Sequence, residues 1–177
     1  MAEAALSYPA VGATRPHDAH WESRPAAFRS YERTLLLGHG QHLWQQATSE
    51  LMTWGVKTRS GFSVESVPPG AASAELGVDY RLTAALGPFR LREPVRVVAV
   101  VAEPTRCGFA YGTLEGHPVS GEEAFVVHRD IEGSVWLTLR SLTRPGGGRW
   151  RLAFPVVLVA QRWYRRRYLR ALRDVSG

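Results

Sequence analysis

Apolar and polar residues alternate most regularly in the stretch from Cys107 to Pro145. It contains three short runs rich in aromatic and β-branched residues, at 107–114, 122–129 and 134–142. Glycine, proline and aspartate separate the runs, and these residues favour the tight turns that join neighbouring antiparallel strands. The stretch therefore predicts a meander of three antiparallel strands.

A helical repeat of apolar residues occurs between Gln41 and Trp54. The apolar residues recur every three or four positions, as on one face of an amphipathic helix. They are Leu43, Trp44, Ala47, Leu51 and Trp54. Gly55 follows, and glycine often takes the left-handed conformation that ends a helix. We therefore expect a helix over 41–54 with Gly55 as its C-terminal cap.

Shorter alternating runs predict strands on both sides of this helix. One is expected at 32–37, and two more are expected at 61–67 and 78–84, separated by a loop rich in proline and glycine. The run 95–101 is almost continuously apolar, which is typical of a central strand buried on both faces.

The last predicted element is a long helix that begins near Pro155, because proline suits the first turn of a helix. One side of this helix is apolar and the opposite side carries arginines, several of them near the C-terminal end, where the helix dipole favours positive charge. The apolar positions are Val156, Ala160, Trp163, Tyr164, Tyr168, Ala171 and Leu172.

These elements predict an α+β fold in which a curved antiparallel sheet grips the long C-terminal helix. Residues 1–32 show little periodicity and several prolines, so we expect an extended N-terminal segment packed on the domain. The length of 177 residues is that of a single domain, 1–177.

A cavity is expected between helix and sheet where the facing side chains are small. Gly108, Ala110 and Gly112 share one face of the first meander strand and would leave such room. Aromatic residues of the sheet and the helices would complete the lining. The candidate pocket residues are Trp54, Gly108, Ala110, Tyr111, Gly112, Trp136 and Tyr164.

Composition excludes several classes of protein. Cys107 is the single cysteine, so neither an intramolecular disulfide bond nor a cysteine-based zinc site can form. The first residues lack the basic and apolar regions of a secretory signal, and no apolar run reaches the ~20 residues that span a bilayer. The sequence therefore predicts a cytoplasmic protein with no transmembrane segment.

The formal net charge of +6 and the isoelectric point near 10.1 make anionic partners worth considering. Lys57 is the only lysine among 22 basic residues, and an arginine bias of this kind often reflects a GC-rich genome. We therefore expect no specific nucleic-acid binding from the charge alone. The sequence does not define the oligomeric state.

Three stretches of the meander resemble an uncharacterised protein family. They are Gly108-Phe-Ala-Tyr-Gly-Thr-Leu114, Gly116-His-Pro118 and Gly121-Glu-Glu-Ala-Phe125. The similarity extends over essentially the whole chain, from Tyr8-Pro-Ala-Val-Gly-Ala-Thr14 to Ser141-Leu-Thr-Arg-Pro145. The chain is similar to the domain of unknown function nineteen-ninety family, and this resemblance implies a START-like, helix-grip fold. It implies no activity and no catalytic residues.

The most suggestive polar residues surround the first turn of the meander. Histidine and carboxylate side chains can bind zinc or iron, but Glu122 and His128 would lie on one face of a strand and Glu123 on the other, so we expect no metal. A single buried glutamate facing the cavity, with its pKa raised by burial, could instead act as a general base with Tyr111 or His117.

No nucleotide fingerprint and no nucleophile motif occurs, so no cofactor is expected. The preferred function is the binding of a small, largely hydrophobic molecule in the cavity between sheet and helix. One alternative is an enzyme of cyclase, hydrolase or isomerase type that uses Glu122 or Glu123 with His117 or Tyr111. A second alternative is a basic module that binds nucleic acid or a membrane surface.

Overall fold

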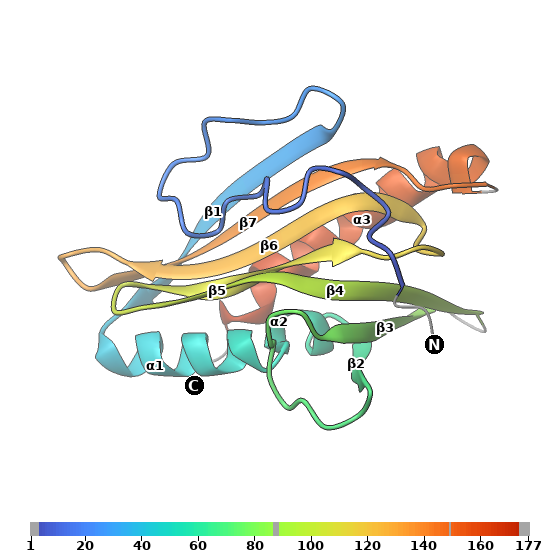
Figure 1. Cartoon of the computed structure of the whole chain (residues 1–177). Coiled ribbons are helices and arrows are strands. Elements are labelled where there is room, and N and C mark those ends of the chain that lie inside the picture. The colour runs from blue at the N-terminus through green and yellow to red at the C-terminus, as the bar shows by residue number, and fades with distance from the viewer. Residues whose placement is uncertain (1–3, 87–88, 149, 174–177) are drawn as a thin grey trace.

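Within residues 4–86, 89–148 and 150–173, which the computed structural model describes, seven antiparallel strands form one curved sheet (Figure 1). The elements are β1 (Arg29–His39), α1 (Gln41–Met52), α2 (Gly55–Thr58), β2 (Phe62–Val67), β3 (Asp79–Leu86), β4 (Phe89–Glu103), β5 (Arg106–Thr113), β6 (Val119–Arg129), β7 (Ser134–Pro145) and α3 (Trp150–Ala171). The strand order is β1-β7-β6-β5-β4-β3-β2, so β2 to β7 follow one another as hairpins and β1 pairs with β7.

The long helix α3 grips the sheet from one side, which confirms the predicted α+β, helix-grip architecture. It contacts β6, β7 and α2. In Figure 1, α3 runs behind the strands, whereas residues 4–28, the N-terminal segment, cross the near side. We call the side of α3 the inner face of the sheet and the opposite side the outer face.

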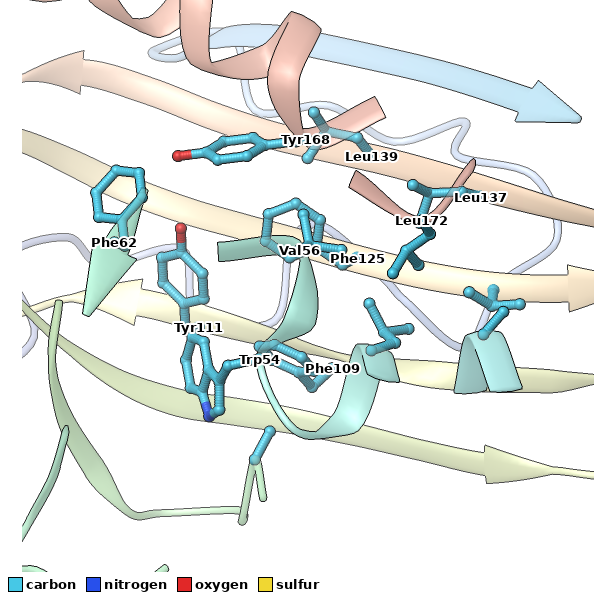
Figure 2. Packing of buried hydrophobic residues seen from close by; sticks show 14 of the residues in the cluster. Trp54, Val56, Phe62, Phe109, Tyr111, Phe125, Leu137, Leu139, Tyr168 and Leu172 are labelled. Carbon is cyan, nitrogen blue, oxygen red and sulfur yellow. The ribbon is translucent and has the colours of Figure 1, made fainter. Parts of the chain in front are cut away.

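Most of the hydrophobic core lies between the inner face and the helices. Alternating residues of β5, β6 and β7 point inward, because successive side chains of a strand face opposite sides. Figure 2 shows Phe109, Phe125 and Leu139 of these strands in one cluster with Tyr168 of α3 and with Leu172, which directly follows that helix. Burying such side chains is the main source of stability, at roughly 1.5–3 kcal/mol each.

The N-terminal segment covers the outer face and is anchored there. Tyr8, Trp21 and Phe28 are buried against Leu142 of β7 and form a second, smaller apolar cluster. Two buried arginines of the sheet donate hydrogen bonds to backbone carbonyls of the segment. Arg106 binds Pro16 and Asp18, and Arg140 binds Thr14, Arg15 and Ala19.

The end of α1 differs from the prediction. The helix ends at Met52, and the left-handed residue is Trp54, with φ of 64°, whereas Gly55 begins α2. A Cβ atom on Gly55 would lie 2.6 Å from the Glu50 carbonyl oxygen, so glycine is needed there for close approach. Trp54 is held in its conformation by the rings of Tyr80 and Phe109, whose centroids lie within 5 Å of its own.

The beginning of α3 also differs. The helix starts at Trp150, so Pro155 lies inside it rather than in its first turn. Tyr164, Tyr168 and Leu172 are buried as predicted, but the predicted stripe does not continue, because Val156 and Trp163 are exposed. No helix among the described residues is long and apolar enough to cross a membrane.

The apolar run 95–101 belongs to the longer strand β4 and is not buried on both faces. Val95, Val97 and Val101 are buried, whereas Val98 and the two residues after it are half-buried. A bulge after Val97 shifts the register with β5. The sequence pattern suggested full burial because nearly every residue of the run is apolar, whereas residues 98–100 remain half-buried around the bulge.

Candidate functional site

A cavity of about 240 Å³ lies between α3 and the inner face of the sheet. Its walls are mainly hydrocarbon and aromatic groups. They include Phe62 of β2, Leu91 of β4, and Val157, Ala160 and Tyr164 of α3. Polar side chains lie on the same walls, and we call six of them the polar cluster. These are Lys57, Glu93, Tyr111, His117, Glu123 and Tyr168.

Lys57 is the centre of the polar cluster. It extends from the short helix α2, is only 2% exposed, and donates hydrogen bonds to Glu123 Oε2 at 3.0 Å and to the Tyr168 hydroxyl at 2.7 Å. Its ammonium group also lies 4.8 Å from the ring centroid of Phe62 and 4.2 Å from that of Tyr168. Aromatic faces attract a desolvated cation, so the ammonium group is held both by a carboxylate and by the rings.

Glu123 joins two strands and a helix. Besides the ammonium group of Lys57, its Oε2 accepts a hydrogen bond from the hydroxyl of Tyr111 on β5, which is opposite it in the register of β5 and β6. Figure 2 shows the hydroxyl groups of Tyr111 and Tyr168 directed towards the same space beside Phe62. Burial, and then the charge of Glu123, raise the pKa of both tyrosines well above the usual value, so both remain protonated.

Glu93 and His117 form a second pair on the cavity wall. The ring nitrogen Nδ1 of His117 accepts a hydrogen bond from the Val119 backbone N–H at 3.1 Å, so the neutral ring carries its proton on Nε2. Nε2 lies 3.7 Å from Glu93 Oε2. This is too long for a hydrogen bond, and it leaves both groups able to bind a ligand.

Burial sets the protonation states of this pair. It raises the pKa of Glu93 to about 7, an effect that Lys57 opposes and Glu123 reinforces. Burial, together with the positive charge of Lys57, lowers the pKa of His117 to about 3. Near neutral pH the cavity therefore contains a neutral imidazole and a carboxyl group that can either donate or accept a proton.

All four candidate acid–base residues border the cavity, and the side chains of three of them belong to its polar cluster. Tyr111, His117 and Glu123 are part of the polar cluster. The carboxylate of Glu122 lies on the outer face, where it accepts hydrogen bonds from the N-terminal segment. One of them comes from the Tyr8 hydroxyl at 2.7 Å. The other donors are the backbone N–H of Gly12 and the backbone N–H and hydroxyl of Thr14.

The candidate pocket residues divide between the two faces. Tyr164 and Tyr111 line the cavity, and Trp54 packs in the core against Tyr111 with ring centroids 5.7 Å apart. The prediction was wrong for Trp136, which lies on the outer face and donates a hydrogen bond to Asp130. It was also wrong for the small residues of β5, which are Gly108, Ala110 and Gly112.

These small residues make room for the backbone and for the N-terminal segment, not for a ligand. A Cβ atom on Gly112 would lie 2.7 Å from Tyr8 Cε1, and one on Gly108 would lie 2.8 Å from Val126 Cα. Ala110 lies between them on the same outer face. The sequence pattern separated the two faces of β5 correctly but assigned the cavity to the wrong one.

His117, Glu122, Glu123 and His128 do not converge on one point. His128 is on the outer face, where its Nε2 is 3.1 Å from the Thr138 hydroxyl oxygen, and Glu122 is on that face as well. Among the described residues there is no group of three or more histidine, cysteine, aspartate or glutamate side chains close enough to hold a metal ion.

Sequence reasoning missed Lys57, Glu93 and Tyr168 as site residues. One feature of the sequence could have indicated Lys57. It is the only lysine among 22 basic residues, and it follows a predicted helix with a glycine cap. A compact ammonium group can be enclosed by aromatic rings and one carboxylate more easily than a guanidinium group with five donors. Glu93 and Tyr168 show no local signal, because the cavity that surrounds them is formed by distant segments.

Solved structures with the same arrangement define the class of protein. A hypothetical protein from Helicobacter pylori has a TM-score of 0.60 at 11% identity, over 100% of this chain and 99% of that chain. A norcoclaurine synthase of Thalictrum has a TM-score of 0.55 at 10% identity, over 88% of this chain and 100% of that one. Ara h 8.0201 has a TM-score of 0.50 at 12% identity, over 83% and 96%. The protein therefore has the START-like, helix-grip fold.

The family follows from the sequence. The family described as Domain of unknown function (DUF1990) matches residues 7–171, and the chain belongs to it. A UPF0548 protein of Deinococcus radiodurans is 34% identical over 162 residues, which are 84% of this chain and 79% of that protein. A UPF0548 protein of Arabidopsis thaliana is 27% identical over 138 residues, 75% of this chain and 65% of that protein. These matches confirm the resemblance inferred from the motifs of the meander.

Proposed function

We propose that the protein binds a small, largely hydrophobic molecule in the cavity between the sheet and α3. The observation that carries the proposal is a cavity of about 240 Å³ whose apolar walls enclose one polar cluster. Ligand sites are commonly of this kind, with mainly apolar lining and a few convergent polar groups. The volume is below the ~300–1,000 Å³ of drug-sized sites, which favours a small ligand.

The polar cluster favours a ligand with one polar end. A buried ion pair such as Lys57 and Glu123 contributes little net stability, because removing both charges from water costs several kcal/mol. A pair that is weakly stabilising but lies on a cavity wall is well placed to recognise a ligand group. His117 Nε2 and Glu93 would bind the same polar end from the β4 side of the cavity.

Native mass spectrometry tests this function. The protein is purified without denaturation and its mass is compared with that of the variant Ala160→Phe, in which a ring fills the cavity from α3. We expect a bound small molecule in the natural protein and not in the variant. The control is Val159→Phe, which adds a ring at the neighbouring position, where the side chain is 65% exposed.

A titration with indole, followed by NMR, measures binding if the natural ligand is lost during purification. We expect shifts at cavity residues in the natural protein and in Val159→Phe, and none in Ala160→Phe. Equal binding of indole by all three proteins, with no co-purified molecule in any of them, would contradict the proposal.

A second candidate function is acid–base catalysis on the bound molecule. It is favoured by Glu93, whose pKa of about 7 is suited to proton transfer at neutral pH, and by the neighbouring His117. The co-purified molecule would be incubated with the natural protein and with Glu93→Gln. Conversion to a product by the natural protein alone, with binding kept in the variant, would identify an enzyme. Binding without conversion would leave a carrier.

A further inference from the structure

A second hollow lies on the opposite flank of α3. It has a volume of about 370 Å³ and is bounded by the start of β1, the end of β7 and the middle of α3. Arg29 of β1 and three residues of α3, Arg162, Arg165 and Arg166, line it, and no carboxylate is among the described residues of its lining. We call it the arginine groove. It concentrates positive charge at one place on the protein.

Three of these arginines have no partner in the part of the chain that the structure describes. Arg29, Arg162 and Arg166 form no hydrogen bond or ion pair with any described residue. Arg162 and Arg166 are one helical turn apart, where like charges repel by a few tenths of a kcal/mol. An anion in the groove would remove this repulsion and would be attracted by all four guanidinium groups.

Arg165 lies at the floor of the groove in a fixed orientation. Its guanidinium group stacks over Tyr31, 4.2 Å from the ring centroid, and donates a hydrogen bond to Ser141 Oγ at 2.7 Å. Its Nε is buried without a hydrogen-bond partner among the described residues, and so is Oε1 of Gln161, one turn earlier. Each buried polar atom without a partner costs about 1–3 kcal/mol, so a ligand that satisfies both atoms is favoured.

We propose that the arginine groove binds a phosphate group. Guanidinium groups present paired N–H donors that match two oxygens of a phosphate, and arginines from β1 and α3 can approach it from two sides. A phosphate that keeps one proton can also donate to Gln161 Oε1, which a carboxylate cannot do. The groove lies across α3 from the cavity, so this inference does not depend on the proposed function, although Gln161 and Arg165 border both hollows.

Isothermal titration calorimetry with inorganic phosphate at constant ionic strength tests the site. The double variant Arg162→Ala/Arg166→Ala removes two exposed side chains of the groove and leaves the core intact. We expect it to weaken phosphate binding at least tenfold. The matched control is Arg170→Ala/Arg173→Ala, which removes the same charge from exposed positions outside the groove and should change the affinity less than twofold.

Decyl phosphate identifies the source of the phosphate group. Tighter binding of decyl phosphate than of inorganic phosphate, with the gain lost in Ala160→Phe, would indicate a lipid-like ligand whose chain enters the cavity. Equal affinity for both compounds would indicate a free phosphate or a small phosphate ester. Equal weakening by the groove pair and the control pair, or by neither, would overturn the inference, whatever the outcome for indole in the cavity.

Discussion

Glu122 and Glu123 are adjacent in β6, yet one belongs to the outer face and the other to the cavity on the inner face. The carboxylate of Glu122 accepts four hydrogen bonds, all from the N-terminal segment. That of Glu123 accepts from Lys57 and Tyr111 and lies beside a space that a small molecule can enter. A glutamate side chain therefore holds the N-terminal segment in place on the outer face, and another one is available to a ligand on the inner face.

The two faces also differ in what the buried polar groups bind. On the outer face, Arg106 and Arg140 donate to backbone carbonyls, so the polar groups hold a segment that has no regular structure to satisfy its own backbone. On the inner face, the partners of Lys57 are side chains of the cavity wall. We infer that removing polar groups from the outer face destabilises the fold, whereas replacing both members of the inner ion pair together mainly affects binding.

The largest expected effect is that of Glu122→Ala. The substitution leaves two backbone N–H groups and two hydroxyl groups of the N-terminal segment without their acceptor, so we expect a loss of about 3–5 kcal/mol in the free energy of unfolding. Urea denaturation measures it. The exposed Glu115 gives a control, since Glu115→Ala should change stability by less than about 0.5 kcal/mol. A small effect of Glu122→Ala would mean that the N-terminal segment is not fastened through this carboxylate.

The pH dependence of stability sharpens the comparison on the inner face. Because the pKa of Glu93 is raised to about 7 from 4.5, the folded protein is destabilised by the charged carboxylate at pH above 7 and recovers as the pH falls towards 4.5. Relative to the natural protein, Glu93→Gln should be more stable at pH 8, by on the order of 2–3 kcal/mol, and equally stable at pH 4.5. Thermal unfolding across this range measures the difference.

The effect of His117 on stability depends on pH in the opposite direction to that of Glu93. The pKa of His117 is lowered to about 3 from 6.5, so the stability that comes from keeping the ring neutral is present above pH 6.5 and is lost as the pH falls towards 3. The variant His117→Asn should therefore lose less stability than the natural protein between pH 6.5 and pH 3. If both variants followed the natural protein at every pH, the pair would be solvated and would not be part of a buried cluster.

Alternation along the chain predicted much of the fold and one half of the site. It identified the meander, the first helix and the final helix. It also placed Glu122 with His128 on one face of β6 and Glu123 on the other, as the structure confirms. Alternation alone does not say which face is the inner one when both are covered. On β5 the small residues were therefore taken for the cavity side, whereas the inner side carries Phe109 and Tyr111.

The rest of the site depends on contacts between distant segments. Lys57 comes from a four-residue helix, Glu93 from a long strand, and Tyr168 from the last helix, and the contacts that unite them span up to 111 residues. No short window of sequence contains such a set. The arginine groove is a similar case, because its members on β1 and α3 meet only once β1 pairs with β7 at the edge of the sheet.

A smaller effect is expected from Gly112→Ala on the outer face. The added methyl group would meet Tyr8 and Leu6, so the N-terminal segment must shift, at a cost of about 1–3 kcal/mol. Urea denaturation again gives the value, and faster proteolysis of the N-terminal segment should accompany the loss. The control is Gly116→Ala, where nothing lies within 4 Å of the new Cβ atom, although its φ of +91° adds backbone strain. If proteolysis of the N-terminal segment is faster in Gly112→Ala and not in Gly116→Ala, the cause is the contact with Tyr8 and Leu6 and not backbone strain.

The smallest effect on stability, from Lys57→Met combined with Glu123→Leu, is the most informative. Replacing both members of a buried ion pair by apolar residues is often neutral or stabilising, whereas removing one alone leaves a buried charge and costs about 3–5 kcal/mol. We expect each single variant to be strongly destabilised and the double variant to lie within about 1 kcal/mol of the natural protein by urea denaturation, because only the hydroxyls of Tyr111 and Tyr168 lose a partner. The double variant should nevertheless lose the molecule seen by native mass spectrometry. If the double variant is instead as unstable as Glu122→Ala, the ion pair of Lys57 and Glu123 stabilises the fold as much as the Glu122 carboxylate does. The distinction between the two faces would then be wrong.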